Sequence, residues 1–239
     1  MKKIISIILV ILLVASTAVL LTACGGGIKS AEKWQEAMDA YKTVDTVTVT
    51  IEDDHKMVNQ IANKERLLST VEIAFDASKG MAYVNMDYTR RNFWESDVGV
   101  GSYEIYYVLD GTNVIAYKKN LRTQQWEAPQ TIELSSSEVA QAYLRERYLK
   151  PTDTDGGEFP TFTELKFEDF KADLFGNYKW TPTDSRFKYT YELIFLSGKP
   201  SDFSYKHRAA STGNVDDSRK FSMTVEYSAS ITIPTDLPN

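Results

Sequence analysis

The sequence predicts an α+β fold: one large, curved antiparallel sheet of about nine strands, a half-barrel whose concave face is covered by two or three helices. Three observations predict it. Hydrophobic side chains alternate with polar ones in nine separate rows, which is the period of a half-buried strand. Short turn sequences join most of these rows as hairpins, and hairpins produce antiparallel pairing. Two other segments carry the spacing of an amphipathic helix.

The first predicted element is a helix over residues 31–42. Ser30 precedes it and has a side chain suited to an N-cap. The apolar residues that recur at helical spacing are Trp34, Ala37, Met38 and Tyr41. We expect this stripe to pack into the core.

The alternating rows define the expected strands. They cover residues 46–51, 70–75, 82–88, 103–109, 114–118, 187–195, 203–207, 221–227 and 231–233. Turn residues connect neighbouring rows at Asp76–Gly80, Asp110-Gly111 and Ser197-Gly198-Lys199-Pro200. The last row precedes Pro234, which lacks the N–H needed for ladder pairing, so pairing should weaken there.

A second helix is predicted from Ser135 to about Tyr148. Ser135 and Glu138 have the pattern of a capping box, and Pro151 ends the segment because proline cannot continue a helix. Residues 151–160 contain several glycines and prolines and are interpreted as a loop within the domain. A short third helix is predicted from Phe167, Phe170 and Leu174 and ends at Gly176-Asn177.

The N-terminus has the features of a bacterial lipoprotein signal. Met1-Lys2-Lys3 precedes an apolar run over residues 4–21. Leu21-Thr22-Ala23-Cys24 resembles a lipobox, in which a peptidase cuts next to small residues and the cysteine thiol takes up a diacylglycerol. We predict cleavage between Ala23 and Cys24 and lipid attachment at Cys24, the one cysteine of the chain. A retained membrane-spanning anchor is the alternative, because the run nearly reaches across a bilayer.

This signal divides the chain into a signal peptide (1–23), a flexible glycine-rich tether (24–30) and a single α+β domain (31–239). Loss of Lys2 and Lys3 leaves 25 basic and 33 acidic residues, a formal charge of −8. This charge argues against nucleic acid as a partner. The predicted location is the extracytoplasmic face of the bacterial plasma membrane, with a Gram-positive cell favoured, and the acylated cysteine would hold the protein there.

A twisted sheet of this size tends to curl, which creates one concave face. The expected strands place many Phe, Tyr and Met side chains on one face. Helices could close that face into a solid core, or cover it in part and leave an apolar cavity; alternation does not distinguish the two. The expected lining of such a cavity is Tyr107, Tyr189, Tyr191, Phe195, Met223 and Val225.

The order of the elements and the C-terminal strands resemble a known group of proteins. The segments that carry the resemblance are YELIFLSGKP (191–200), MTVEYS (223–228) and ITIP (231–234), within a layout over about 40–236. This layout is similar to the LolA/LppX/LprG-like group of bacterial lipoprotein carriers and envelope lipoproteins. The resemblance implies an apolar cavity for acyl chains between the sheet and its helices, and it supplies no catalytic residue.

Few polar residues form a pattern typical of catalysis or metal binding. Glu52-Asp53-Asp54-His55 could supply a general base or half a metal site, and we interpret it as the solvated end of a strand. His207 could be a core or cavity histidine, or lie at a frayed strand end. Residues 153–158 resemble a calcium loop, but Pro151 and Phe162 stand where its first and last ligands belong. We predict no metal, no cofactor and no enzymatic activity.

Two further groups of residues are not interpreted as functional sites. Gly99-Val100-Gly101 lacks the lysine and the helix of a phosphate loop and is expected to be a turn. A set of basic residues could touch lipid head groups, but they are scattered among acidic residues, so we expect them at solvated strand edges: Arg90, Arg91, Lys118, Lys119 and Arg122.

The favoured function is a membrane-anchored, non-catalytic protein that binds a hydrophobic ligand or lipid between sheet and helices. The alternative is an envelope lipoprotein with a closed core that contacts a protein partner through Phe93-Trp94 or Trp126. An enzyme that depends on His55 or His207 ranks last.

Overall fold

The computed structural model describes residues 28–59, 63–92, 97–152, 158–173, 176–183, 187–209 and 218–238. The predicted signal peptide with Ala23, Cys24 and the rest of the lipobox lies outside these residues, as do Phe93-Trp94 and residues 153–157 of the calcium-like segment. Cleavage and lipid attachment therefore stay predictions. Within the described ranges, no helix is long and apolar enough to cross a bilayer.

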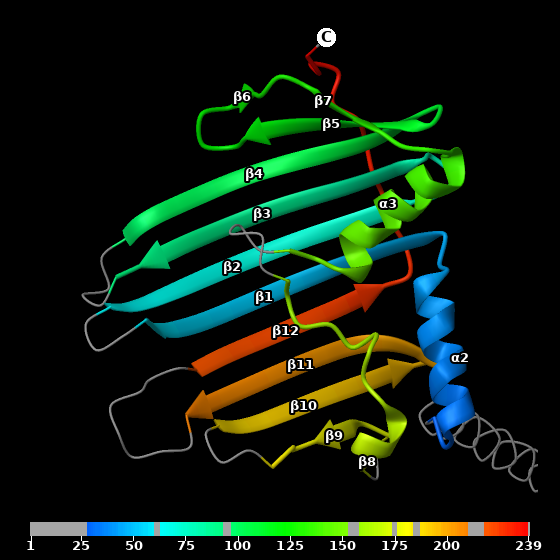
Figure 1. The fold of residues 1–239 in the computed structure, drawn as a ribbon, viewed down its shortest axis with the longest axis vertical. Coiled ribbons are helices and arrows are strands. Elements are labelled where there is room, and N and C mark those ends of the chain that lie inside the picture. The colour runs from blue at the N-terminus through cyan, green and yellow to red at the C-terminus, as the bar shows by residue number, and fades with distance from the viewer. Residues whose placement is uncertain are drawn as a thin grey trace, which may run out of the picture.

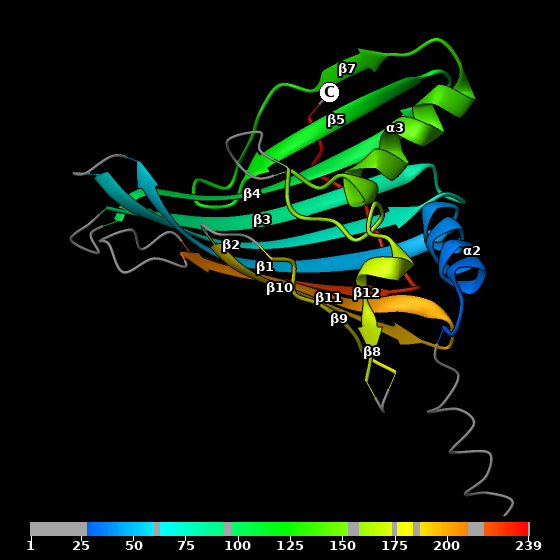
Figure 2. The same ribbon diagram turned by 60° about the horizontal axis from the view of Figure 1, so that its bottom comes forward.

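One antiparallel sheet forms the body of the protein (Figure 1). Its twelve strands follow the order β6-β5-β4-β3-β2-β1-β12-β11-β10-β9-β8, with β7 paired to β5. The sheet curves without closing, and the helices lie on its concave side (Figure 2), which confirms the predicted α+β class. The strands are β1 (Thr46–Asn59), β2 (Asn63–Asp76), β3 (Met81–Arg91), β4 (Asp97–Asp110), β5 (Asn113–Asn120), β6 (Gln125–Trp126), β7 (Gln130–Glu133), β8 (Lys171–Ala172), β9 (Tyr178–Trp180), β10 (Phe187–Leu196), β11 (Lys199–Ala209) and β12 (Ser218–Glu226).

The two faces of the sheet are covered differently. Side chains alternate along β1, so Val49 and Ile51 point to one face and Thr48 and Thr50 to the other. We call the face that carries helices α2 (Ala31–Lys42) and α3 (Ser137–Leu149) the inner face and the opposite one the outer face. The main hydrophobic core lies between the inner face and these helices.

The centre of the core is formed by the strands that meet in the middle of the sheet. The side chains of β1, β2 and β12 that face inward here are at most 5% exposed, and they are Val47, Val49, Ile51, Val71, Ile73, Phe75, Phe221, Met223 and Val225. Burying one such large side chain stabilises the fold by about 1.5–3 kcal/mol. The pairing of β1 with β12 brings the two ends of the chain together in this core.

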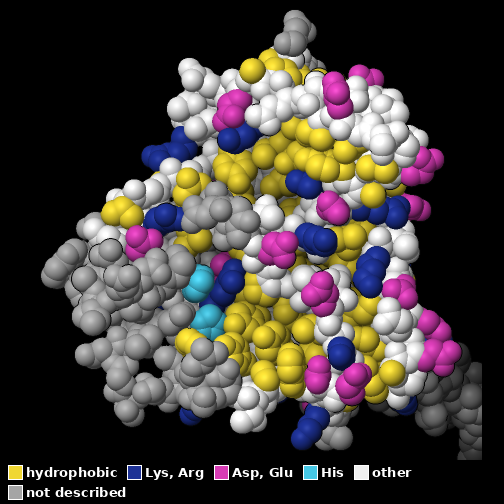
Figure 3. Space-filling model, in the orientation of Figure 1, with side chains coloured by type: hydrophobic (Ala, Val, Ile, Leu, Met, Phe, Trp, Pro, Cys, Tyr) yellow, Lys and Arg dark blue, Asp and Glu magenta, His cyan; other side chains and the backbone are white. Residues whose placement is uncertain are grey.

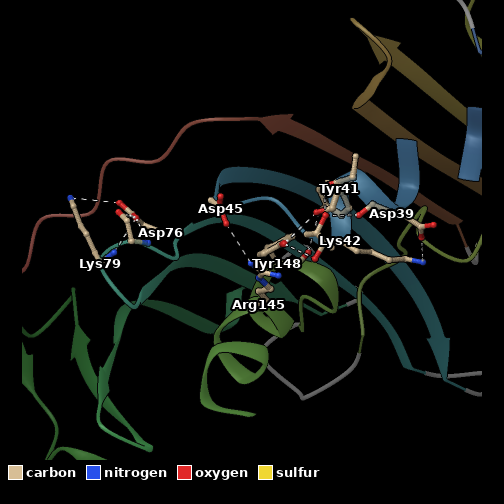
Figure 4. A network of polar contacts seen from close by, with 11 residues as sticks. Asp39, Tyr41, Lys42, Asp45, Asp76, Lys79, Arg145 and Tyr148 are labelled. Atoms are coloured by element: carbon tan, nitrogen blue, oxygen red, sulfur yellow. Dashed lines mark hydrogen bonds and ion pairs between the residues drawn. The ribbon is translucent and has the colours of Figure 1, made fainter. Parts of the chain in front are cut away.

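Two buried tyrosines join the helices to each other (Figure 4). Tyr41 of α2 donates a hydrogen bond from Oη to the Tyr148 carbonyl of α3, and Tyr148 Oη donates to the Tyr41 carbonyl, both at 3.3 Å. Arg145 of α3 also forms an ion pair with Asp45, at 3.7 Å, just before β1. These bonds satisfy carbonyls at the C-terminal ends of both helices, which α-helices leave unpaired.

Helix α2 has the predicted bounds and cap, because Ser30 Oγ accepts a hydrogen bond from the Lys33 N–H at 3.2 Å. In helix α3 the predicted cap is wrong by one residue. Ser136, not Ser135, has the extended backbone that an N-cap needs, and its Oγ accepts from the Val139 N–H at 3.3 Å. A hydrogen bond with Ser136 lowers the pKa of the Glu138 carboxyl in the first turn.

Eight of the nine predicted strands are present, and the ninth, over residues 231–233, is wrong. That segment crosses the outer face instead, where Ile231 is buried against Ala74 and Met81. Lys79 Nζ holds it by donating to the Ile231 carbonyl at 2.9 Å. Ile233, the other apolar residue of this row, is 40% exposed, so two alternating residues were too short a pattern to establish a strand.

Strands β6 to β9 were not predicted, because two to four residues are too few to show an alternating pattern. The predicted third helix is also wrong. Residues 167–169 form a single 3-10 turn (Phe167–Asp169), and Lys171–Ala172 then pair with β9 as strand β8.

Two segments outside the strands and helices complete the core. Within and just after the predicted loop 151–160, Phe159 and Phe162 are 3% and 0% exposed, and the Phe159 ring lies 5.9 Å from that of Phe221. Ile28, in the predicted tether, is 5% exposed, and its carbonyl accepts a hydrogen bond from Tyr178 Oη. Contacts with the fold therefore begin before the predicted domain boundary at residue 31.

Candidate functional site

The helices and loops cover the centre of the inner face fully, but they cover only part of the areas to either side of that centre. Beside the fully buried centre, Tyr189, Tyr191 and Tyr205 of β10 and β11 are half-buried, although they point to the same face. On the other side, Tyr103 and Tyr107 of β4 are also half-buried. Figure 3 shows hydrophobic side chains reaching the surface in two areas of this face, one toward β5 and one toward β10.

The area on β9 to β11 is an aromatic platform, which we define as Trp180, Phe187, Tyr189, Tyr191 and Tyr205. Tyr191 lies opposite both Trp180 and Tyr205 in the sheet register. Its ring stacks on Trp180 with centroids 4.8 Å apart and lies 4.9 Å from Tyr205. Such contacts each contribute about 0.5–1.5 kcal/mol beyond the buried area. The result is a surface of packed aromatic rings that stays partly exposed.

The phenol of Tyr191 remains protonated on this platform. Burial and the neighbouring Tyr189 raise the pKa of Tyr191 above its ordinary value of 10.0. Its hydroxyl can therefore donate a hydrogen bond at any physiological pH.

The two histidines of the chain border the aromatic platform. His207 lies opposite Tyr189 in the register, with the two rings 5.9 Å apart, and its Nδ1 is 2.7 Å from Tyr205 Oη. The ring of His55, on β1, is 6.0 Å from that of His207. Figure 3 shows both side chains next to each other on the inner face. Sequence reasoning treated them separately, since 151 residues stand between them.

The segment Glu52-Asp53-Asp54-His55 is divided between the two faces by strand alternation. Asp53 and His55 point inward, and Glu52 and Asp54 point outward. Our interpretation as a solvated strand end is wrong for Asp53, whose side chain is 1% exposed. Its carboxylate accepts hydrogen bonds from Arg219 Nε at 2.8 Å and Nη2 at 2.9 Å, which compensate the cost of burying its charge.

Two of the six predicted lining residues are in the core, and a third, Phe195, is half-buried against it. Met223 and Val225 are 1% and 5% exposed within the main cluster. The ring of Phe195 lies 5.1 Å from Trp34 of α2 and 5.4 Å from Tyr178.

The remaining three predicted residues lie in the half-covered areas beside the core. Tyr189 and Tyr191 belong to the aromatic platform. Tyr107 lies on the opposite side, where the Arg147 guanidinium stands 5.4 Å from its ring and burial raises the pKa of its hydroxyl. All six residues share one face, as predicted from alternation; that they contact a ligand stays a prediction.

A hollow of about 740 Å³ crosses the outer face, which sequence reasoning missed. The register places its lining in three neighbouring rows that run across six strands. The backbone of the middle row forms the floor, because its side chains point inward; the walls are two rows of outward side chains. One wall is Ser204, Ser222, Glu52, Thr70, Asp87 and Ser102, and the other is Lys206, Lys220, Asp54, Leu68, Thr89 and Val100.

Most residues that line this outer groove are polar, unlike those of the cavity that the sequence predicted. Hydroxyls, carboxylates and two lysines line it, and Arg122 closes one end by donating to the Val100 carbonyl at 3.0 Å. The signal in the sequence was the run of Ser, Thr and charged residues at the outward positions of the strands.

Gly99-Val100-Gly101 lies within β4, so the predicted turn is wrong. Gly101 stands opposite Tyr88, whose ring lies over it on the inner face, and a Cβ at this position would collide with that ring. The glycine therefore allows the close approach of an aromatic side chain rather than a change of direction.

Trp126, which the sequence marked as a docking residue, is half-buried near the C-terminal end of the chain. Its Nε1 donates to the Asp236 carboxylate at 3.2 Å, and the Lys119 ammonium lies 5.0 Å from its ring. In the part of the chain that the structure describes, no three His, Cys, Asp or Glu residues are placed to hold a metal ion.

No family model matches this chain, and no curated protein matches it. Among solved structures it is similar to an S-type phycobiliprotein lyase from Guillardia theta, at 10% sequence identity and a TM-score of 0.25, over 85% of this chain and 95% of that one. A likeness at this level carries no argument about function. The resemblance to the LolA/LppX/LprG-like group stays a prediction.

Proposed function

We propose that this protein is a membrane-anchored, non-catalytic lipoprotein that binds a hydrophobic ligand or a lipid on the inner face of its sheet. The observation that supports the proposal is the uneven cover of that face. Helices α2 and α3, together with Phe159 and Phe162, bury the centre, whereas the aromatic platform beside it is only half-buried. An apolar, rigid surface with hydroxyls at its rim is typical of sites for hydrophobic ligands. The ligand would therefore lie beside the helices rather than beneath them.

The proposed anchor is a diacylglycerol on Cys24, after cleavage of residues 1–23. Ile28 is held by the core, so Gly25-Gly26-Gly27 would be the tether. Four residue steps span at most about 14 Å, which would keep the domain at the membrane surface. The location that we propose is the extracytoplasmic face of a bacterial plasma membrane, where a lipid ligand is close at hand.

Native mass spectrometry of the full chain, purified from bacterial membranes, tests the proposed function. We expect an adduct of lipid mass that solvent extraction removes and added lipid restores. Tyr191→Ala should lower its occupancy about tenfold, because the residue is the centre of the stacked rings. The control is Thr190→Ala, one residue away on the outer face, which should leave the adduct unchanged.

A chain without an adduct, even after incubation with lipid, would contradict the proposal. The envelope interaction protein with a closed core would then be the better explanation. Circular dichroism of each variant shows whether the fold is retained.

A further inference from the structure

The outer face carries a patch of exposed basic side chains at one end of strands β10, β11, β12 and β1. The sheet register places Lys188, Arg208 and Lys56 in one row of outward positions. Lys206 and Lys220 stand opposite each other in the adjacent row. Each of these residues is exposed, and we call them the basic patch: Lys56, Lys188, Lys206, Arg208 and Lys220.

Carboxylates do not neutralise the basic patch. Among the described residues of these two rows, followed across the whole sheet, the carboxylates are Asp54 and Asp97. An arginine of the same rows holds each of them: Arg66 binds Asp54 at 2.8 and 2.9 Å, and Arg91 binds Asp97 at 3.0 Å. The described part of the two rows therefore contains five more basic than acidic side chains.

The next outward row, on the other side of Lys206 and Lys220, is acidic. It contains Glu192, Glu52 and Asp87, and Glu192 forms an ion pair with Lys179 at 2.9 Å. Positive charge is thus gathered at one end of these strands, although the chain as a whole has a formal charge of −6.

Two cross-strand pairs in the basic patch set like charges directly opposite each other. Lys206 lies opposite Lys220, and Lys188 lies opposite Arg208. Opposite positions bring Cβ atoms to about 4.5–5.5 Å, and like charges at that separation destabilise a sheet. A negatively charged partner that covers the patch would remove this repulsion, so the arrangement favours binding of anions.

The basic patch is broad, and it lies near the start of the proposed tether. Its four strands span about 14 Å, so its charges fit a surface with many anionic groups better than one small anion. Tyr178, whose Oη donates to the Ile28 carbonyl, lies opposite Leu193 on β10. Lys188 is five positions away on the same strand, about 17 Å. The proposed anchor at residue 24 would therefore hold this edge of the sheet close to the membrane.

We propose that the basic patch docks on the surface of a membrane that contains anionic phospholipids. Its ammonium groups and the Arg208 guanidinium bind phosphate oxygens of the head groups through charge-assisted hydrogen bonds. Each basic residue near such a surface favours the docked state by about fivefold. This inference goes beyond the proposed ligand and uses only the proposed anchor.

Docking through the outer face is compatible with the proposed ligand site. The aromatic platform lies on the opposite face of β10 and β11, because Tyr189 alternates with Lys188 and Tyr205 alternates with Lys206. A membrane that covers the basic patch therefore leaves the platform uncovered.

Lysine acetylation of the full chain in nanodiscs tests this inference. One set of discs contains phosphatidylcholine alone and the other a mixture with phosphatidylglycerol, and mass spectrometry measures the acetylation rate of each lysine. We expect phosphatidylglycerol to slow acetylation of Lys188, Lys206 and Lys220 by about threefold or more, because docking covers their ammonium groups. The rate of Lys150, which is exposed at the end of α3, should not change. In 1 M salt, where the Debye length is about 3 Å, the difference should disappear.

Two matched variants sharpen this test. Lys206→Gln combined with Lys220→Gln removes two charges of the patch, and it should return the Lys188 rate in phosphatidylglycerol discs to its value in phosphatidylcholine. Lys150→Gln combined with Lys166→Gln removes the same charge from exposed sites outside the patch, and it should leave the Lys188 rate unchanged. The first variant also removes a pair of opposed like charges, so its thermal midpoint should not fall.

The outcomes separate this inference from the proposed anchor. A chain that co-purifies with both kinds of disc but shows equal lysine rates in them would overturn the docking patch and leave the anchor intact. A chain that co-purifies only with phosphatidylglycerol discs would support the patch and contradict the anchor, and one that co-purifies with neither would overturn both. If soluble polyglutamate slows the three lysines where phosphatidylglycerol does not, the patch binds an acidic protein partner, and docking on the membrane is wrong.

Discussion

Asp53 and Asp54 are neighbours on β1, and each accepts a bidentate pair of hydrogen bonds from one arginine. Arg219 holds Asp53 at 2.8 and 2.9 Å on the inner face, and Arg66 holds Asp54 at the same two distances on the outer face. The carboxylates differ in burial, with 1% of the Asp53 side chain exposed and 28% of Asp54. The same bidentate pair of hydrogen bonds thus compensates a buried charge on the inner face and joins two partly solvated groups on the outer face.

The same contrast holds for the two faces as a whole. The inner face excludes water at its centre, so each polar group there needs a partner. The outer face carries the groove of hydroxyls and charges, which water can solvate. A substitution on the inner face should therefore lower the free energy of unfolding more than a substitution of the adjacent residue on the outer face. The following predictions test this from the largest effect to the smallest.

Removal of one partner from each ion pair should show the largest difference. Arg219→Ala should lower the free energy of unfolding by about 3–5 kcal/mol, because it leaves a buried charge unpaired. Arg66→Ala should lower it by less than about 1 kcal/mol, since water can solvate Asp54. Urea denaturation of both variants measures the difference. Equal losses would show that the two faces do not differ in the way their burial indicates.

Truncation of adjacent side chains on β1 is the second test. Ile51→Ala should cost about 2–5 kcal/mol, because Ile51 is 0% exposed and leaves a cavity in the core. Thr50→Ala, on the outer face, should stay within about 0.5 kcal/mol. Urea denaturation of both variants, fitted with one m-value, measures the two free-energy changes. A cost for Thr50→Ala comparable to that of Ile51→Ala would contradict the assignment of the faces.

Helix α3 covers part of the inner face, and its first turn depends on the N-cap residue Ser136. Ser136→Ala should cost about 1 kcal/mol, because the Val139 N–H loses its acceptor. Ser135→Ala is the matched control, and it should change the thermal midpoint little. If Ser135→Ala had the larger effect, the capping box predicted from the sequence would be correct after all.

Acid should remove the stabilisation that two carboxylates of the outer face supply. Hydrogen bonds from Arg66 lower the pKa of Asp54, and hydrogen bonds from Ser78 and Lys79 lower that of Asp76, both below 3.8. A lowered pKa in the folded state means that this stability is present above pH 3.8 and is lost as the pH falls through the folded value. Stability measured from pH 6 to pH 2 should therefore decline more steeply for the wild type than for Asp54→Asn. Parallel curves would contradict this contribution.

Local patterns predicted much of the fold and little of the site. Helix 31–42 and eight strands could be predicted, because spacing and turn residues act within a few positions of each other. Residues 231–233 show where this reasoning ends. Ile231 and Ile233 alternate like a strand, but they belong to a segment that covers the outer face. Ile231 is buried there but Ile233 is 40% exposed, so the alternating pattern predicted neither a strand partner nor the burial of both residues.

The candidate site shows the same limit more strongly. Sequence reasoning placed Tyr189 and Tyr191 on the correct face, and it considered His55 and His207 one at a time. The two histidines lie close together because β12 lies between β1 and β11 and brings Arg219 next to both of them. No spacing along the chain encodes that neighbourhood.

The sequence by itself determined the α+β class, the first helix and the inward or outward direction of the strand residues, because these depend on interactions between near neighbours. Only the tertiary structure decided which part of the inner face stays open and why Asp53 is buried while Asp54 is not. The reason is physical: Arg219 is 166 positions from Asp53, and packing of the whole sheet sets the register that joins them.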